Sequence, residues 1–178
     1  QADGWYLRSD IIWNKPNPMP EPVKDRPTKS HEYIFLLTKS AKYYYDAEAI
    51  KENGEYPAGT KAAKGSAKRY STDLVNSRPP EYKVYDGLRN KRSVWKITTK
   101  PYKEAHFATF PEELPEICIK AGTQKGDVVL DIFAGSGTTL RVASKLGRKG
   151  IGIELNPEYI KILKKRCKIE SMSLEAFV

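Results

Sequence analysis

The sequence has 178 residues, of which 39% are hydrophobic, a length and composition that suit one globular domain with a hydrophobic core. Its formal net charge is +9, and residues 51–100 contribute most of this excess, with 12 basic and 5 acidic residues. No apolar run approaches the ~20 residues of a membrane span, and the spacing of the two cysteines and two histidines fits neither a disulfide framework nor a zinc site.

The first 50 residues are predicted to form strands. Residues 5–13, WYLRSDIIW, are aromatic and β-branched, and the proline-dense NKPNPMPEP follows them as a rigid loop. Residues 31–47 hold two apolar runs separated by KSAK, which predicts an antiparallel hairpin. The continuous run YIFLL within them predicts a strand buried on both faces. The opening residues QADG are typical of a helix end, which suggests that an upstream part of the chain is absent.

The middle of the chain is predicted to be a mobile basic insert. Residues 52–78 are rich in Gly, Ala, Ser and Lys and show no apolar periodicity. A short strand, RSVWKI at residues 92–97, is predicted to close this insert. The local basic excess favours a surface that faces the phosphates of a nucleic acid, with a solvated loop as the alternative.

The last third of the chain predicts a βαβ unit. A helix over residues 111–123, ended by Gly122, precedes an apolar strand over residues 127–133. The turn AGSGTT then leads into a helix over residues 138–146, with Ser136 or Thr138 as its N-cap. The segment KGIGIEL predicts a second, parallel strand, and a further helix begins after Asn156 as its N-cap.

This unit predicts a site for a ribose-bearing ligand. Gly135 and Gly137 allow the backbone to approach a ligand closely, and Glu154 at the end of the second strand can accept hydrogen bonds from ribose hydroxyls. Leu140 stands where a dinucleotide fingerprint has a third Gly or Ala. Asp131 suits a ligand ammonium group better than a pyrophosphate, although it could simply cap the turn. These features favour S-adenosylmethionine as the cofactor.

Several segments together resemble one known family. DIFAGSGTT is similar to the S-adenosylmethionine motif of the DNA amino-methyltransferases, which methylate N6 of adenine or N4 of cytosine, and SDIIWNKPNPMPE, DRPTKSHEYIFLLTKS, HFATFPEELPE and GIELNPEYI resemble further family segments in the same order. The resemblance implies an α/β fold, a Rossmann-like S-adenosylmethionine-dependent methyltransferase sheet with permuted motif order, N-terminally incomplete. It divides the chain into catalytic-side strands and a hairpin (1–50), a basic target-recognition insert (51–100) and an S-adenosylmethionine-binding part (101–178).

The resemblance also implies functional residues. The expected cofactor-binding residues are Phe107, Ala108, Thr109, Asp131, Phe133, Ala134, Gly135, Gly137, Thr138, Glu154, Leu155 and Asn156. Trp13, Asn14 and Lys15 are expected to flank the pocket of the target base, the alternative being a buried Trp13 and a solvated Lys15. Lys61, Lys64, Lys68 and Arg69 are expected to contact DNA phosphates, which would make DNA affinity fall steeply with salt. His106 is expected to be structural.

The family's catalytic motif, D/N/S-P-P followed by an aromatic residue, is not found in these 178 residues. SRPPEY at residues 77–82 is the nearest match, but Arg78 and Glu81 interrupt the pattern, which favours a proline-stiffened loop. In the permuted order this motif is expected upstream of Gln1, so the catalytic residues stay unknown.

Three functions therefore remain open. The first is a site-specific DNA methyltransferase that acts on an exocyclic base amine, in the cytoplasm of a bacterium, archaeon or phage, with double-stranded DNA as substrate and a companion restriction endonuclease. The second is a non-catalytic fragment that binds S-adenosylmethionine or DNA. The third, disfavoured by Leu140 and Asp131, is a dinucleotide-dependent oxidoreductase. An exposed sheet edge would also let the chain form a homo-oligomer.

Overall fold

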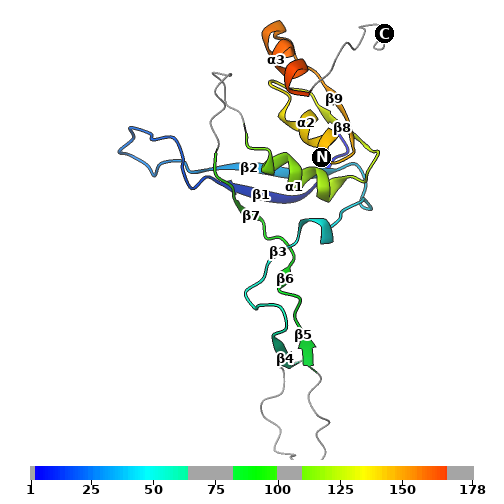
Figure 1. The fold of residues 1–178 in the computed structure, drawn as a ribbon. Helices are drawn as coiled ribbons and strands as arrows, with labels where there is room; N and C mark the ends of the chain where they lie inside the picture. Colours follow the sequence, from blue (N-terminus) through cyan, green and yellow to red (C-terminus); the bar gives the residue numbers. More distant parts are fainter. Residues whose placement is uncertain (1–2, 64–81, 100–109, 168–178) are drawn as a thin grey trace, which may run out of the picture. The chain divides into compact units, whose positions relative to one another are not determined.

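The structure is a computed structural model that describes residues 3–63, 82–99 and 110–167 (Figure 1). The chain divides into two compact units. Unit 1 comprises Gln1–Ala49 and Arg92–Val178, and unit 2 comprises Ile50–Lys91. None of the helices within the described ranges combines the length and apolarity needed to cross a membrane.

Unit 1 contains a three-stranded sheet in the order β2-β1-β7. The central strand, β1 (Tyr6–Asn14), pairs antiparallel with β2 (His31–Thr38) and parallel with β7 (Val94–Lys96). Both β1 and β7 confirm the strands predicted at residues 5–13 and 92–97. Through this parallel pairing, β7, which follows the insert in the sequence, lies beside β1.

The hairpin predicted within residues 31–47 is wrong. The partner of β2 is β1, reached through the proline-containing segment 15–30, and residues 39–47 form no strand. The second apolar run, Tyr43 to Tyr45, instead leaves all three tyrosine side chains exposed. A sheet partner far away in sequence has therefore replaced the nearby one, because β1 offers eight paired positions to β2.

Within the described ranges, other elements cover only one face of the three-stranded sheet. On that face Trp13, Trp95 and Ile97 are buried, and residues next to and within α1 (Glu113–Gly122) pack against them. On the opposite face Tyr33 and Phe35 of β2 are 52% and 56% exposed. The prediction that YIFLL is buried on both faces is therefore wrong for the described structure, because no described element covers the second face.

The predicted βαβ unit is confirmed. It comprises β8 (Val128–Asp131), α2 (Thr138–Lys145) and β9 (Lys149–Gly152), with β8 and β9 parallel. The helix α3 (Pro157–Cys167) follows, and the Asn156 side chain caps it by accepting a hydrogen bond from the Glu158 N–H at 2.9 Å. Figure 1 shows α2 alongside β8 and β9. Ile119 of α1 joins Val142 and Ala143 of α2 in a shared core.

Leu140 sets how α2 packs on β9. A Cβ atom on Gly152 would lie 2.6 Å from Leu140 Cδ1, and one on Gly150 would lie 3.0 Å from Leu140 Cδ2. Gly150 and Gly152 of β9 therefore leave the space that the large Leu140 side chain of α2 occupies. The close approach of helix and strand that a small residue at position 140 would give is here provided by two strand glycines.

Unit 2 consists of short ladders. It begins at the last residue of the 3-10 helix η1 (Glu48–Ile50). Within it, β3 (Glu52–Asn53) pairs with β6 (Leu88–Arg89), and β4 (Lys61–Ala63) pairs with β5 (Tyr82–Val84). Arg89 Nε donates to Glu52 Oε1 at 2.9 Å across the first ladder. The described ends of the insert thus have regular structure that the sequence pattern did not predict.

Candidate functional site

Two carboxylates stand at the ends of neighbouring parallel strands. Asp131 is the last residue of β8, and Glu154 follows β9 by two residues. Because β8 and β9 run parallel, their carboxyl ends lie at one edge, where ligands of open α/β sheets bind. Both residues are partly buried.

The backbone orients the Glu154 carboxylate from two sides. Its Oε2 accepts a hydrogen bond from the Gly135 N–H at 2.8 Å, and its Oε1 accepts one from the Asn156 N–H at 2.8 Å. Each carboxylate oxygen can accept more than one hydrogen bond. Glu154 therefore keeps capacity for two hydroxyl donors while its side chain stays fixed.

The two carboxylate oxygens of Asp131 differ in their surroundings. Its Oδ1 accepts a hydrogen bond from the Phe133 N–H at 3.0 Å, which matches the turn-capping alternative. Its Oδ2 has no hydrogen-bond partner within the described part of the chain. The turn therefore holds the carboxylate in place, and the second oxygen is left to accept a hydrogen bond from a cationic group.

The loop between β8 and α2 is tightly turned. Ala134 N–H donates to Ile153 O at 3.0 Å, and Gly137 N–H donates to Ala134 O at 2.7 Å. Gly135 and Gly137 have φ values of +50° and +79°, which favour glycine. Gly137 is the N-cap of α2, without a side-chain cap hydrogen bond, so the predicted capping by Ser136 or Thr138 is wrong.

Two apolar side chains project from this edge. Phe133, in the loop after β8, is 83% exposed, and Leu155, next to Glu154, is 92% exposed. Exposed apolar groups beside convergent polar groups are typical of ligand sites. This edge can therefore offer acceptors to an ammonium group and to vicinal hydroxyls, together with exposed apolar side chains for the less polar parts of a ligand.

The residues expected to flank a target base differ in their surroundings. Trp13 is 4% exposed, and its Nε1 donates to Ile97 O at 2.8 Å, so its ring belongs to the core and is not open for stacking. Lys15 lies over the Trp13 ring, with Nζ 4.5 Å from the ring centroid, and it also pairs with Glu32. Asn14 accepts a hydrogen bond from Ile97 N–H through its backbone oxygen at 3.1 Å.

Several expected site residues lie outside the described residues. These are Phe107, Ala108 and Thr109 of the cofactor set, and Lys64, Lys68 and Arg69 of the DNA-contact set. Lys61, the remaining member of the DNA-contact set, lies on β4 and is exposed. The segment SRPPEY lies outside the described residues apart from Tyr82, which is in β5.

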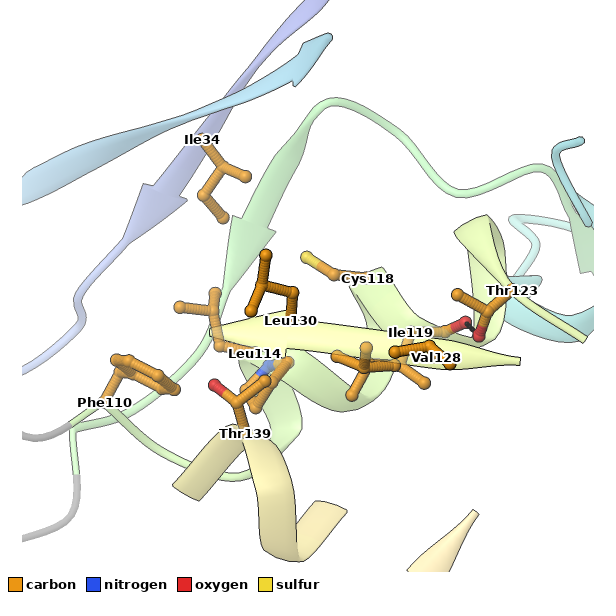
Figure 2. Close-up of a pocket in the computed structure, with 11 residues that line it drawn as sticks. Ile34, Phe110, Leu114, Cys118, Ile119, Thr123, Val128, Leu130 and Thr139 are labelled. Atoms are coloured by element: carbon orange, nitrogen blue, oxygen red, sulfur yellow. Dashed lines mark hydrogen bonds between the residues drawn. The ribbon is translucent and has the colours of Figure 1, made fainter. Parts of the chain in front are cut away.

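A separate, apolar cavity of about 460 Å³ runs along β8. Figure 2 shows its lining, in which Leu114, Cys118 and Ile119 come from α1, Val128 and Leu130 from β8, and Ile34 from β2. Three consecutive residues of β8 line it and no β9 residue does, so it follows the β8 edge that faces away from β9. Cys118 is exposed at this cavity, and desolvation by the surrounding apolar side chains raises the pKa of its thiol further, to about 11.

Glu112 and Arg166 lie at the site, although the sequence patterns did not single them out. Arg166 Nη1 donates to Ser136 Oγ at 2.6 Å and to Thr138 Oγ1 at 3.1 Å. Glu112 accepts a hydrogen bond from Lys145 at 2.6 Å. The basic residues Lys164, Lys165 and Arg166 at the end of α3 are ordinary for a helix C-terminus, so no local signal identified Arg166.

Comparisons with known proteins identify the family and the fold. A family model described as DNA methylase, for N6 and N4 methylation, matches residues 1–165. The chain is similar to the type II methyltransferase M.Cfr9I of Citrobacter freundii, with 49% identity over 174 residues that cover 98% of this chain and 48% of that protein. The chain thus spans about half the length of the curated relatives it matches.

Two solved structures share the fold. The PvuII DNA methyltransferase, described as cytosine-N4-specific, matches with a TM-score of 0.64 and 24% identity, over 97% of this chain and 55% of that chain. A complex of M1.HpyAVI with SAM matches with a TM-score of 0.60 and 26% identity, over 94% and 65%. In both cases the similarity extends over nearly the whole of this chain.

Proposed function

Because the chain belongs to the DNA methylase family whose model matches residues 1–165, we propose that it supplies the S-adenosylmethionine site of a DNA methyltransferase. The reaction moves a methyl group to the exocyclic amine of adenine or cytosine. The observation that supports this proposal most directly is the pair Asp131 and Glu154, held by backbone hydrogen bonds at the ends of adjacent parallel strands.

Each residue of the site has a proposed part in binding. Asp131 Oδ2 accepts a hydrogen bond from the methionine ammonium, and Glu154 accepts hydrogen bonds from the ribose hydroxyls. Leu155 and Asn156 border the adenine, while Phe133 contacts the methionine portion. The methionine portion is proposed to be lined on one side by the loop residues Ala134, Gly135, Gly137 and Thr138. On the other side it is proposed to contact Phe107, Ala108 and Thr109. These contacts hold the cofactor in one orientation.

The chemistry requires positioning more than covalent help from the protein. When bound, S-adenosylmethionine supplies a methyl group on a sulfonium, which an amine nitrogen attacks in line before losing a proton. Rate enhancement then comes from orientation and from the electrostatics of the site. The target base must leave the helix stack to reach the methyl group.

We also propose double-stranded DNA as the substrate. Lys61, Lys64, Lys68 and Arg69 would contact phosphates from the basic insert, and Asn14 and Lys15 would border the target base. If so, a DNA titration repeated at low and moderate salt shows a steep loss of affinity, and an affinity that does not change would exclude these phosphate contacts. A companion restriction endonuclease and a cytoplasmic location fit the type II methyltransferases that the chain resembles.

The edge of β8 is a proposed site for strand pairing. Within the described residues, β8 pairs with β9 alone, and β2 pairs with β1 alone. Both β8 and β2 contribute side chains to the apolar cavity. We infer that a further strand occupies this cavity and pairs with the edge of β8. This strand comes from a second copy of the chain or from another part of a longer polypeptide.

The cofactor assignment is tested by calorimetric titration of S-adenosylmethionine. The protein used is the full-length gene product, of which these 178 residues are all or part. Asp131→Asn keeps an oxygen for the Phe133 N–H but removes the negative charge. Glu154→Gln removes the charge together with one of the two oxygens that accept backbone hydrogen bonds. Since a hydrogen bond to a charged group contributes about 1.5–3 kcal/mol, each variant should bind at least ~10-fold more weakly.

Glu158→Gln is the matched control. Glu158 is on α3, two residues after Asn156, and its exposed carboxylate pairs with Lys161. It should bind the cofactor as the unmodified protein does. Binding of NADH in place of S-adenosylmethionine would support the oxidoreductase alternative and refute the proposal. Cofactor binding without any methylated adenine or cytosine, detected by mass, would favour the non-catalytic alternative.

A further inference from the structure

Glu112 connects three helices. It immediately precedes α1, and its carboxylate meets Arg141 and Lys145 of α2 and Arg166 of α3. The Lys145 Nζ–Oε2 distance is 2.6 Å, the Arg141 Nη1–Oε1 distance is 3.2 Å, and the Arg166 Nη2–Oε1 distance is 3.9 Å. One carboxylate therefore lies among cations from both helices that follow the glycine loop.

Arg166 carries this connection into the loop itself. Its Nη1 donates to Ser136 Oγ at 2.6 Å and to Ser136 O and Thr138 Oγ1 at 3.1 Å each. The Arg166 side chain is 13% exposed, and Thr138 is 4% exposed, so these contacts are well shielded from water. Hydrogen bonds to a charged donor in such surroundings are strong.

The contact from Arg166 restricts a loop that is rich in glycine. Residues 134–137 contain two glycines with positive φ, and glycine loses more conformational freedom on ordering than any other residue. Ser136 lies between them, so a contact to both its side chain and its carbonyl fixes the backbone on either side. Gly135, the neighbour of Ser136, is also the residue whose N–H orients Glu154.

We propose that Arg166 is a positioning residue for the S-adenosylmethionine site. Its guanidinium holds the loop at Ser136 and Thr138, and the Glu112 carboxylate, 3.9 Å from Nη2, offsets its charge. The inference rests on the proposed function, because it assigns the loop to the cofactor.

The test compares Arg166→Ala, Arg166→Lys and the control Lys164→Ala in the full-length gene product. Lys164 lies on the same helix and is exposed. Arg166→Ala should raise the Kd and KM for S-adenosylmethionine at least tenfold. It should leave kcat at saturating cofactor within about threefold, because the reacting atoms are not touched. Arg166→Lys should recover part of the affinity, and Lys164→Ala should change nothing.

A second variant keeps the proposal testable if Arg166→Ala does not fold. Glu112→Gln preserves the shape of the side chain but removes the negative charge that lies 3.9 Å from the guanidinium, so it should raise the cofactor Kd by a smaller factor, about threefold. A merely structural role predicts a lower unfolding midpoint with an unchanged cofactor KM, and that result would overturn the inference.

The two proposals fail in different ways. If the unmodified protein binds no S-adenosylmethionine, the proposed function is refuted, and this inference with it. If the unmodified protein binds the cofactor and Arg166→Ala binds it equally well, only the role of Arg166 is refuted.

Discussion

Gly135 and Gly137 share a positive φ but face different surroundings. A Cβ atom on Gly137 would lie 2.8 Å from Leu163 Cγ and 3.2 Å from Cys167 Sγ, both on α3. The nearest atom to a Cβ on Gly135 would be Phe133 O, at 3.9 Å. A side chain at position 137 would therefore point into the core, whereas a side chain at position 135 would point into open space.

The two alanine substitutions should consequently differ. Both incur the cost of a left-handed backbone, about 1–2 kcal/mol, but Gly137→Ala also forces its methyl group into Leu163, which adds about 1–3 kcal/mol. Urea unfolding should show a distinctly larger loss of stability for Gly137→Ala. Gly135→Ala should instead weaken cofactor binding by more than its stability loss accounts for. Equal losses of stability would contradict this distinction.

Which site residues the sequence revealed depends on how local their signal is. Asp131 and Glu154 could be identified because strand ends and a glycine turn are marked within a few residues of each. Arg166 contacts Ser136 across 30 residues, and nothing in the local pattern separates it from the neighbouring lysines. Trp13 has an aromatic side chain that suits base stacking or a core equally well, and only the packing decides.

At the scale of elements, helices and the βαβ unit were predictable because their signals are local. The helix α1, the parallel strands β8 and β9, and the Asn156 cap all follow from neighbouring residues. The pairing of β2 was mispredicted because strand pairing is a tertiary property. The sequence shows that two runs can form strands, but the partner that buries Ile34 beside Ile11 lies about 20 residues upstream.

The junction of α1, α2 and α3 at Glu112 should depend on pH. Burial alone would raise the pKa of the Glu112 carboxyl, but the hydrogen bond from Lys145 and the surrounding positive charges outweigh it and hold the pKa below its usual value. A lowered pKa in the folded state gives stability that is present above the unfolded pKa of about 4.3. This contribution is lost as the pH falls through the folded value.

The variant Glu112→Gln should therefore be less stable than the unmodified protein at pH 7, and the two should converge as the pH falls below about 4. Urea unfolding at several pH values measures the difference. Glu158→Gln, which alters only an exposed pair with Lys161, should show no such convergence. A stability gap that stays the same at every pH would show that charge is not the cause.

At the scale of the whole molecule, both sheets of unit 1 leave apolar side chains uncovered. Phe35 and Leu37 of β2 are 56% and 48% exposed, and Leu130 of β8 is 59% exposed. Exposed apolar faces next to unpaired strand edges are typical of surfaces that bind further polypeptide. The strand proposed to occupy the cavity along β8 would cover part of this surface.

The isolated 178-residue chain should therefore self-associate. Sedimentation at micromolar concentrations should reveal dimers or larger species, and Phe35→Lys should weaken the association. Met19→Lys, which changes an 83% exposed side chain outside the sheets, should not. A stable monomer at high concentration would contradict the prediction. If a longer gene product is monomeric while the isolated chain associates, the covering strand comes from the same polypeptide.

The hydrogen bonds that orient Glu154 come from the backbone of the protein itself, through Gly135 and Asn156. An acceptor held in this way loses little rotational freedom when a diol binds to it, so more of the interaction energy remains as affinity. A ligand that lacks one ribose hydroxyl cannot be accommodated by turning the carboxylate toward it. If this strand end binds the ribose of the proposed cofactor, the same rigidity should favour a ribose over a deoxyribose.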